Sequence, residues 1–305
     1  MVSVTFPDGS LFSVRESLRT RFSLSKRFRQ LRIDLPSGDR AEHNIYSFDG
    51  SANWLSDYLE GRSVDQVLVS PEVGEEHLKR FADICQRAGV ELRLQLPIAR
   101  EFPQQRLPIQ WLGKRVFDWC AALVILLVLS PVLITTAALI MTTMPGSIFF
   151  YQWRVGVNGK LFRIIKFRSM IEGAEKLHHR VMTGKNGLHK CADDPRITPL
   201  GKFLRKYSID ELPQLFNVLR GEMSLVGPRP WAIYDALRIP PHGMKRLNAL
   251  PGITGAWQVK ARSKLLDLDA VTEFDLSYLR QWSIWEDFKI LLMTVPKVLS
   301  GFGAC

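Results

Sequence analysis

The sequence predicts a mixed α/β protein in which a small N-terminal β-α-β module precedes an apolar helix-break-helix hairpin and a larger domain. Three observations support this class. Residues 64–96 pass from strand to helix to strand periodicity, residues 119–144 form an uncharged run, and residues from about 147 onward mix both patterns with basic loops. The predicted divisions are a soluble module over 1–100, a linker over 101–111, the hairpin over 112–146 and the larger domain over 147–305.

The N-terminal module is recognised by its periodicity. The stretch "VDQVLVS" (64–70) is typical of a buried strand, "GEEHLKRFADICQRAG" (74–89) of an amphipathic helix that ends at Gly89, and "VELRLQL" (90–96) of an alternating strand. The unit has no glycine-rich phosphate loop, so a packing or regulatory role is favoured over nucleotide binding. Residues 1–60 give weaker signals, with short apolar stretches separated by turn residues.

The uncharged run from Trp119 to Met144 is long enough to cross a membrane only as a straight helix of about 39 Å, against a hydrocarbon core of roughly 30 Å. Pro131 interrupts it, because an interior proline removes a backbone hydrogen bond and kinks the helix. Ser130 can satisfy a backbone group that the break leaves free. Each half then reaches only partway across a bilayer.

Basic residues flank the run on both sides. Arg106, Lys114 and Arg115 precede it, and Arg154, Lys160, Arg163, Lys166 and Arg168 follow it. Positive residues mark the cytoplasmic side, so we expect a re-entrant hairpin that enters and leaves through the cytoplasmic face. A single tilted spanning helix and a buried core helix are the alternatives.

The net charge of +11 favours an anionic partner, such as a phosphorylated substrate, an anionic membrane lipid or nucleic acid. Nucleic-acid binding is not expected, because no basic module with interleaved aromatic residues is recognisable. The four cysteines have no metal-ligand spacing and fit a reducing, cytosol-facing location. The first 30 residues contain no apolar core of a signal peptide, so no cleavable leader is expected.

Asp210 and Glu211 are the first candidates for chemistry. Ser208 and Glu211 fit a capping box, which would make the acids part of a helix start. Pro213 disfavours helical geometry at Leu212, so we expect the helix to begin near Pro213 and to end near Gly221. A carboxylate or a bound phosphate is favourable at that position. The residues alone therefore support capping and catalysis equally.

Several cations surround this stretch in sequence, on separate segments rich in turn residues or glycine. They are Lys166, Arg168, Arg196, Arg205 and Arg229, the last between two prolines. Arginines and lysines on separate rigid loops predict a pyrophosphate clamp. The pair Asp193-Asp194 could bind a metal, but acids beside a proline favour turn chemistry.

The C-terminal stretch 283–302 predicts an amphipathic helix. Its apolar face contains Ile284, Phe288, Leu291, Leu292 and Val295. Packing in the core is the default expectation for such a stripe, with the membrane interface as the alternative.

Residues from about 112 to 305 resemble the bacterial sugar transferase family, the monotopic polyprenyl-phosphate phosphoglycosyl transferases that begin exopolysaccharide, capsule or O-antigen assembly. The resemblance rests on the order and spacing of "KRVFDW", "LSPVL", "YQWRVGVNGKLFRIIKFRSM", "DDPRITPLGKFLRKYSIDELPQLFNVLRGEMSLVGPRP", "LPGITGAWQVKARS" and "DLSYLRQWSIWEDFKIL". Two positions depart from the family pattern: Ala261 replaces a glycine, and Trp153 stands where a charged residue is common. Large members carry four N-terminal spanning helices, and the β-α-β unit resembles the end of the soluble domain that follows them, so a truncated architecture is expected.

The resemblance implies transfer of a sugar-1-phosphate from a UDP-sugar to polyprenyl (undecaprenyl) phosphate, with release of UMP and with Mg²⁺ as cofactor. Asp210 matches the nucleophile that forms a covalent phosphosugar intermediate, and Glu211 matches the ligand of Mg²⁺. Lys166, Arg168, Arg205 and Arg229 would bind substrate phosphates, and Asp275 in "DLSY" matches a supporting acid. The form "WQV" around Trp257 is more similar to the hexose-1-phosphate branch than to the N-acetyl-sugar branch.

The same resemblance implies a place at the bacterial plasma membrane, with the larger domain on the cytoplasmic face and anionic lipids as further partners. A homo-oligomer is compatible with it. The rival hypothesis is a non-catalytic scaffold on the membrane surface, which accounts for the charge and the hairpin but not for two acids among cations.

Overall fold

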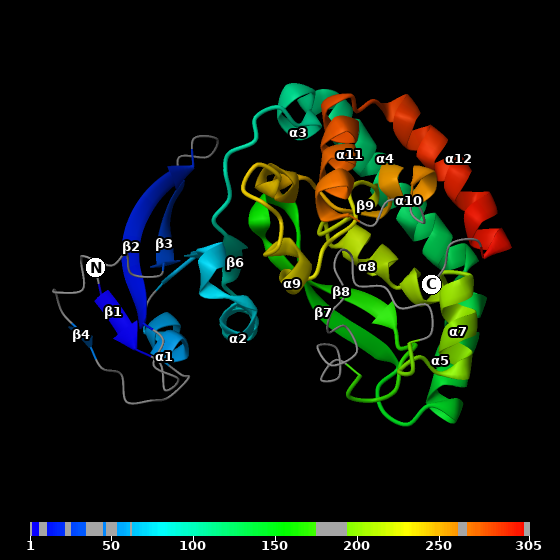
Figure 1. The fold of residues 1–305 in the computed structure, drawn as a ribbon, viewed down its shortest axis with the longest axis horizontal. Helices are drawn as coiled ribbons and strands as arrows, with labels where there is room; N and C mark the ends of the chain where they lie inside the picture. Colours follow the sequence, from blue (N-terminus) through cyan, green and yellow to red (C-terminus); the bar gives the residue numbers. More distant parts are fainter. Residues whose placement is uncertain are drawn as a thin grey trace. The chain divides into compact units, whose positions relative to one another are not determined.

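The computed structural model describes residues 2–5, 11–21, 26–34, 45–46, 54–61, 63–174, 194–261 and 267–301. They belong to two compact units (Figure 1). The N-terminal unit contains the chain up to Pro97 and two later segments, 158–161 and 232–238. The larger unit contains the rest of the chain from Ile98 onward. The sequence did not indicate that the two later segments belong with the N-terminal unit.

A six-stranded sheet forms the N-terminal unit, with the strand order β4-β1-β2-β3-β5-β6. The neighbours β1 and β2, and β2 and β3, are antiparallel, whereas β3 with β5, β5 with β6 and β1 with β4 are parallel. The strands are β1 (Val2–Thr5), β2 (Leu11–Arg21), β3 (Lys26–Asp34), β4 (Ile45–Tyr46), β5 (Gln66–Val69) and β6 (Glu91–Leu94).

The β-α-β unit expected from the sequence is present in this sheet. Strands β5 and β6 are parallel neighbours, and alternate residues of each are buried, as the alternating pattern predicts. Helix α2 connects them and buries one apolar face. The helical elements of the unit are α1 (Trp54–Glu60), the 3-10 turn η1 (Pro71–Val73), α2 (Glu75–Arg87) and α9 (Ile233–Ala236).

The apolar run forms two helices that meet at the predicted break. Helix α4 (Pro108–Val128) follows the short α3 (Pro103–Arg106) and is bent by 62° against α5 (Ser130–Thr143). Pro131 has no N–H to donate to the carbonyl of Leu127, and the Ser130 hydroxyl donates to that carbonyl instead, at 2.8 Å. Within the described ranges no single helix is long and apolar enough to cross a membrane, and only α4 and α5 together reach that length.

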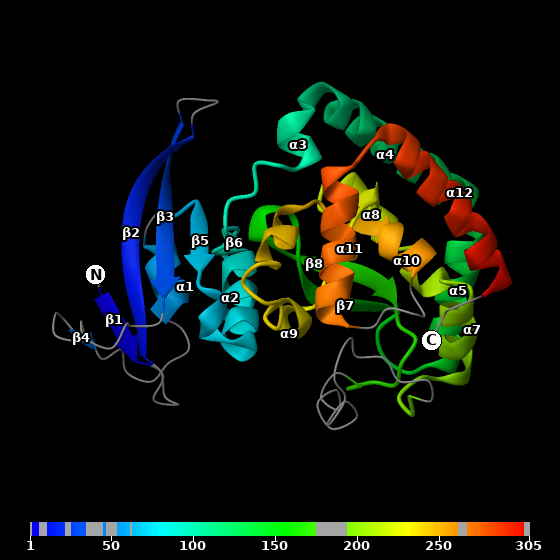
Figure 2. The same ribbon diagram turned by 45° about the horizontal axis from the view of Figure 1, so that its top comes forward.

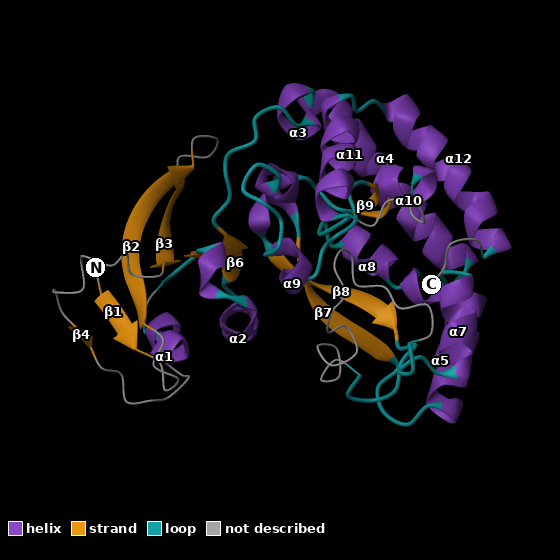
Figure 3. Cartoon of the chain, viewed as in Figure 1, coloured by secondary structure: helices purple, strands orange, loops and turns teal. Residues whose placement is uncertain are grey.

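The remaining elements of the larger unit are mostly helices around two small sheets, in which β7 pairs with β8 and β9 runs parallel to β10 (Figure 3). Their bounds are β7 (Phe149–Val155), β8 (Leu161–Phe167), α7 (Pro199–Lys206), η3 (Ile209–Glu211), α8 (Gln214–Leu219), β9 (Ser224–Val226), η4 (Met244–Asn248), β10 (Gly252–Thr254), α10 (Ala256–Lys260), α11 (Leu268–Arg280) and α12 (Ile284–Ser300). A 3-10 turn η2 (Val157–Gly159) lies between β7 and β8. The mixed α/β class predicted from the sequence is confirmed.

Of the apolar stripe predicted for the C-terminal helix, Leu291 packs against the core, but the other four residues do not, so the default expectation was wrong for most of the stripe. Ile284, Phe288, Leu292 and Val295 are 39%, 42%, 72% and 57% exposed. The inward face of α12 carries Asp287 and Ile290 instead, because α12 lies beside α4 and α11 through polar as well as apolar contacts (Figure 2). Ring contact between Phe117 and Phe288, at 5.4 Å between centroids, joins the exposed stripe to the outer face of α4.

Candidate functional site

The acidic pair lies in a tight turn between two helices. Helix α7 ends at Lys206, Ser208 adopts a left-handed conformation (φ 54°, ψ 22°), and the 3-10 turn η3 carries Asp210 and Glu211. Helix α8 begins just after Pro213, so the predicted helix start is confirmed. The Ser208 side chain makes no capping hydrogen bond, so the capping box that the sequence allowed is not formed. The two acids are therefore held by backbone geometry, and their side chains are available for other contacts.

Glu211 is held by two of the predicted cations. Lys166 Nζ donates to Glu211 Oε1 at 2.7 Å, and Arg229 Nη2 reaches the same oxygen at 3.3 Å. Lys166 comes from β8 and Arg229 from the loop after β9, so residues far apart in sequence meet at one carboxylate. Burial lowers the pKa of Lys166, and the negative charge of Glu211 opposes that effect.

Asp210 is almost completely buried, with 6% of its surface exposed. Burial raises the pKa of Asp210, Lys166 opposes this most strongly, Glu211 raises it further, and Arg205 and Arg229 lower it. The ionised carboxylate thus depends on its cationic neighbours rather than on water. A poorly hydrated carboxylate among cations has the chemistry to attack the phosphorus of a phosphate that such cations could bind.

Arg229 is fixed in place by a second layer of contacts that the sequence did not indicate. Its carbonyl accepts a hydrogen bond from Arg246 Nη2 at 2.9 Å, and Arg246 is in turn paired with Asp275 at 2.6 Å. The Arg246 guanidinium also lies over the Trp231 ring, 4.0 Å from its centroid. Burial raises the pKa of Asp275, and the Arg246 charge opposes this. Asp275 therefore contacts Arg246, which in turn donates to the carbonyl of Arg229.

Asn217 is a second residue that the sequence did not single out. Its amide oxygen accepts from the Ile165 N–H at 3.0 Å, and its amide nitrogen donates to the Arg163 carbonyl at 2.8 Å. Asn217 lies on α8, directly after the acidic turn, and both of its backbone partners lie on β8 next to Lys166. This bridge fixes the strand of Lys166 against the helix that follows Asp210 and Glu211.

The other two predicted phosphate-binding residues have different surroundings. Arg205 Nε donates to Ser169 Oγ at 2.8 Å, and its charge acts on Asp210. Arg168 donates to the carbonyls of Met144 and Pro145, at 2.6 and 2.5 Å, just after α5. The structure thus brings Lys166, Arg205 and Arg229 to the acidic turn, whereas the contacts of Arg168 are at the end of the broken helix pair.

The acids at 193 and 194 were considered as a metal site. Asp193 lies outside the described residues. Asp194 is paired with Arg196, with 2.6 Å between Nη2 and Oδ2, and Arg196 is the largest factor that lowers the pKa of Asp194. Among the residues that the structure describes, no group of three or more His, Cys, Asp or Glu side chains could hold a metal ion.

The fold and the site define a class of protein: a mixed α/β domain that carries a bent apolar helix pair and an acidic pair among cations. The chain belongs to the bacterial sugar transferase family, whose model matches residues 109–301. It is similar to the galactosyl transferase CpsE of Streptococcus agalactiae, with 44% identity over 63% of this chain and 43% of that protein. It is also similar to the exopolysaccharide production protein ExoY of Rhizobium meliloti, with 39% identity over 65% of this chain and 90% of that protein.

A third relative extends into the N-terminal unit. The UDP-glucose:undecaprenyl-phosphate glucose-1-phosphate transferase of Xanthomonas campestris is 33% identical over 82% of this chain and 56% of its own length. The chain thus spans about half the length of CpsE and of the Xanthomonas protein.

Proposed function

We propose that this protein transfers a hexose-1-phosphate from a UDP-sugar to polyprenyl phosphate and releases UMP, as the first membrane step of a bacterial polysaccharide. The observation that carries the proposal is the buried Asp210 carboxylate among Lys166, Arg205 and Arg229. Membership of the bacterial sugar transferase family and the name of the Xanthomonas relative support the choice of substrates.

The reaction proceeds in two displacements at the β-phosphorus of the UDP-sugar. An oxygen of the Asp210 carboxylate attacks this phosphorus, the bond to the bridging oxygen breaks, and UMP leaves with the bonding electrons. The product is an acyl phosphate that holds the phosphosugar on Asp210. An oxygen of the polyprenyl phosphate then attacks the same phosphorus, which forms the lipid diphosphate sugar and restores the carboxylate. Two such displacements replace one transfer between two anionic phosphates.

The cations around the acidic turn neutralise the pyrophosphate. Lys166 and Arg229 already converge on one oxygen of Glu211, so they can share their donors with a phosphate placed beside it. Their positive charge favours the charge that develops on the leaving UMP oxygen. The supports from Asn217 and Arg246 keep both cations in place before the substrate binds.

The acidic pair also fits the binding of Mg²⁺. This ion is typically held by one or two carboxylates together with substrate phosphates and water, and Asp210 and Glu211 supply two neighbouring carboxylates. Glu211 is the proposed ligand of Mg²⁺. The two cations that donate to its Oε1 complement the negative charge of the substrate phosphates that would bind with the metal. When bound, Mg²⁺ would polarise the phosphate oxygens and stabilise their negative charge.

We further propose that α4 and α5 enter the cytoplasmic leaflet and return, so that the protein is monotopic at the plasma membrane. The exposed apolar surface of α4, α5 and α12 supports this, because soluble proteins rarely leave large contiguous apolar surface exposed. Its members include Leu123, Val124, Leu127, Val128, Ile134, Met141, Leu292 and Leu299. Anionic lipids would be attracted by the net charge of +11.

A panel of UDP-sugars with a short-chain polyprenyl phosphate tests the proposal. Detergent-solubilised protein should release UMP with a UDP-hexose and should form a lipid-linked sugar diphosphate. The variant Asp210→Asn is the control for contaminating activity. Absence of UMP release with every UDP-sugar, from folded protein supplied with Mg²⁺, would favour the scaffold hypothesis instead.

A further inference from the structure

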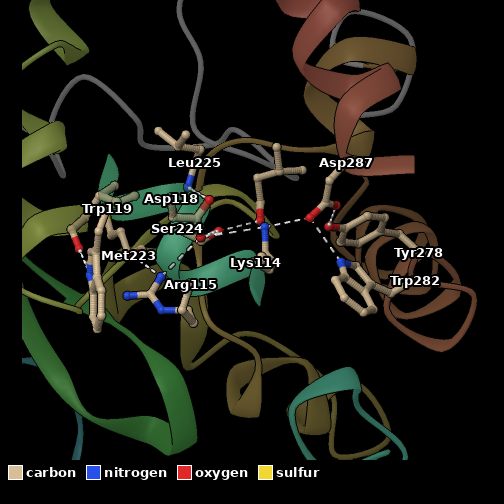
Figure 4. Close-up of polar contacts among 12 residues, drawn as sticks. Lys114, Arg115, Asp118, Trp119, Met223, Ser224, Leu225, Tyr278, Trp282 and Asp287 are labelled. Atoms are coloured by element: carbon tan, nitrogen blue, oxygen red, sulfur yellow. Dashed lines mark hydrogen bonds and ion pairs between the residues drawn. The ribbon is translucent and has the colours of Figure 1, made fainter. Parts of the chain in front are cut away.

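A second set of buried charges joins α4 to the C-terminal helices, and the mechanism above does not use it (Figure 4). Lys114 Nζ is 2.6 Å from Asp287 Oδ2, and Arg115 Nη1 is 3.3 Å from Asp118 Oδ2. Lys114 also lies 3.8 Å from Asp118. We refer to Lys114, Arg115, Asp118 and Asp287 as the buried joint. Its two cations and two carboxylates balance in charge.

The buried joint is completed by hydrogen bonds from α11 and from the connection between α11 and α12. Tyr278 donates its hydroxyl hydrogen to Asp287 Oδ1 at 2.6 Å, and Trp282 donates its indole N–H to Asp287 Oδ2 at 3.1 Å. Burial and the charge of Asp287 raise the pKa of Tyr278, so the hydroxyl keeps its proton. Buried charges are tolerated only when paired and hydrogen-bonded in this way, which fixes the position of α4 against α11 and α12.

Asp118 also binds strand β9 along the edge opposite β10. Its Oδ2 accepts from the Ser224 hydroxyl at 2.7 Å, and its Oδ1 accepts from the Leu225 N–H at 3.3 Å. Arg115 donates to the Met223 carbonyl at 2.9 Å. Because β9 pairs with a described strand only on its β10 side, side chains of α4 supply hydrogen bonds on its other edge that a neighbouring strand would otherwise make.

Strand β9 leads directly to the phosphate-binding arginine. Only Gly227 and Pro228 separate the end of β9 from Arg229, and both are held: the Gly227 N–H donates to Thr254 O, and Pro228 O accepts from the Gly252 N–H, each at 2.9 Å. The segment from the residues of β9 that Asp118 contacts to Arg229 is therefore short and has little freedom. A shift of β9 would move Arg229 relative to Glu211.

We propose that Asp118 is a positioning residue that holds Arg229 at the acidic turn through β9. Phosphate binding by Arg229 then depends on the position of α4, the first helix of the broken pair. The proposal rests on the proposed function, because its activity readout is the binding of the UDP-sugar pyrophosphate. The proposed reaction gives a reason for such a link. A water-soluble donor must meet a lipid-bound acceptor, so the phosphate clamp has to stand at a fixed position relative to the helices that enter the membrane.

Two variants weaken this link to different degrees. Ser224→Ala removes the hydroxyl that joins β9 to Asp118 and leaves the charges of the buried joint paired. Asp118→Asn keeps the shape of the side chain but removes the negative charge that pairs with Arg115 and Lys114. Thr254→Val is the matched control, because it removes a buried hydroxyl bond, the one of 2.9 Å between Thr254 and Thr294, from β10 rather than β9.

We expect Ser224→Ala to raise the KM for the UDP-sugar about fivefold and Asp118→Asn at least tenfold, with a smaller change in kcat and with Thr254→Val unchanged. A purely structural role would instead lower the fraction of active protein at an unaltered KM. In an Arg229→Gln background, the effect of Ser224→Ala on KM should disappear, because the effect passes through Arg229. A KM effect of undiminished size in that background would overturn the proposal.

Hydrogen exchange tests the link between Asp118 and the segment of Arg229 independently of enzyme activity. In the full-length protein, the peptide that covers 223–231 should exchange about tenfold faster in Asp118→Asn, and less so in Ser224→Ala, than in the wild type or in Thr254→Val. Unchanged exchange in both variants would overturn the proposal. Faster exchange in a protein that releases no UMP with any UDP-sugar would leave the positioning role standing and would reject the proposed function.

Discussion

Replacing Asp210 by Asn distinguishes a catalytic role of this carboxylate from a purely structural role. The amide has nearly the same shape and fits the same turn. Burial raises the pKa of Asp210, so the folded protein holds the ionised carboxylate less readily than the unfolded chain does. For an acid with a raised folded pKa, stability falls as pH rises above the unfolded value, here 3.8. Asn carries no charge, so at pH 7 the variant should be at least as stable as the wild type.

The two effects of Asp210→Asn should differ greatly in size. The melting temperature at pH 7 should rise or stay within about 3 °C, which corresponds to about 1 kcal/mol for a domain of this size. The difference from the wild type should shrink as pH falls toward about 4, where the carboxyl becomes protonated in both states. Turnover should fall by about 10⁴-fold, or about 5.5 kcal/mol of transition-state stabilisation at about 1.36 kcal/mol per factor of ten.

The assay combines UMP release with trapping of the intermediate. Wild-type protein given UDP-sugar labelled in the sugar, without lipid acceptor, should release UMP up to about one equivalent and retain label on the protein. Asp210→Asn should do neither, while its melting curve shows a folded protein. A folded Asp210→Asn variant with near-normal turnover would refute the nucleophile assignment. A clearly lowered melting temperature would refute the reasoning from burial.

Three further changes test other parts of the reasoning. Glu211→Gln should raise the Mg²⁺ concentration for half-maximal UMP release at least tenfold, because one of two carboxylates is lost; an unchanged Mg²⁺ dependence would assign the metal elsewhere. Single cysteines near Gln110 and Lys160 should both resist an impermeant periplasmic thiol reagent, and Pro131→Leu should expose one of them by restoring a continuous helix; labelling of only one in the parent protein would indicate a spanning helix. A truncation that begins near Pro103 should retain turnover in detergent with lowered thermal stability, whereas a folded but inactive truncation would place substrate-binding residues in the N-terminal unit.

The acidic turn was partly predictable because its local chemistry is strong. Pro213 fixes where a helix can begin, and the structure starts α8 just after it. The capping box failed as a prediction because Ser208 takes a left-handed conformation, which directs the chain into a 3-10 turn. Ser is a favoured helix N-cap residue, but the tertiary structure places Ser208 in a left-handed conformation that this preference does not predict.

Residues that support the site through distant contacts could not be predicted. Asn217 and Arg246 stand in stretches that read as ordinary helix and loop, and their partners are 52 and 29 positions away. The long pair of strands β2 and β3 was missed for a related reason, since frequent charges obscure the period-two pattern. At the break, the prediction that Ser130 satisfies a freed backbone group is confirmed, and it could be made from the sequence because donor and acceptor are three residues apart.

The cations that flank the apolar run have a structural role in addition to the topological role that the sequence predicts. Lys114, Arg115, Lys166 and Arg168 were counted as topology signals, yet in the folded protein their side chains contact specific carboxylates and carbonyls. Asp287, the partner of Lys114, lies 173 positions later in the chain. Within α4, Lys114 lies 3.8 Å from Asp118, whereas its shorter ion pair with Asp287, at 2.6 Å, requires α12 to pack against α4. A charge that predicts the topology of the hairpin from the sequence thus also fixes α4 against α12 in the folded domain.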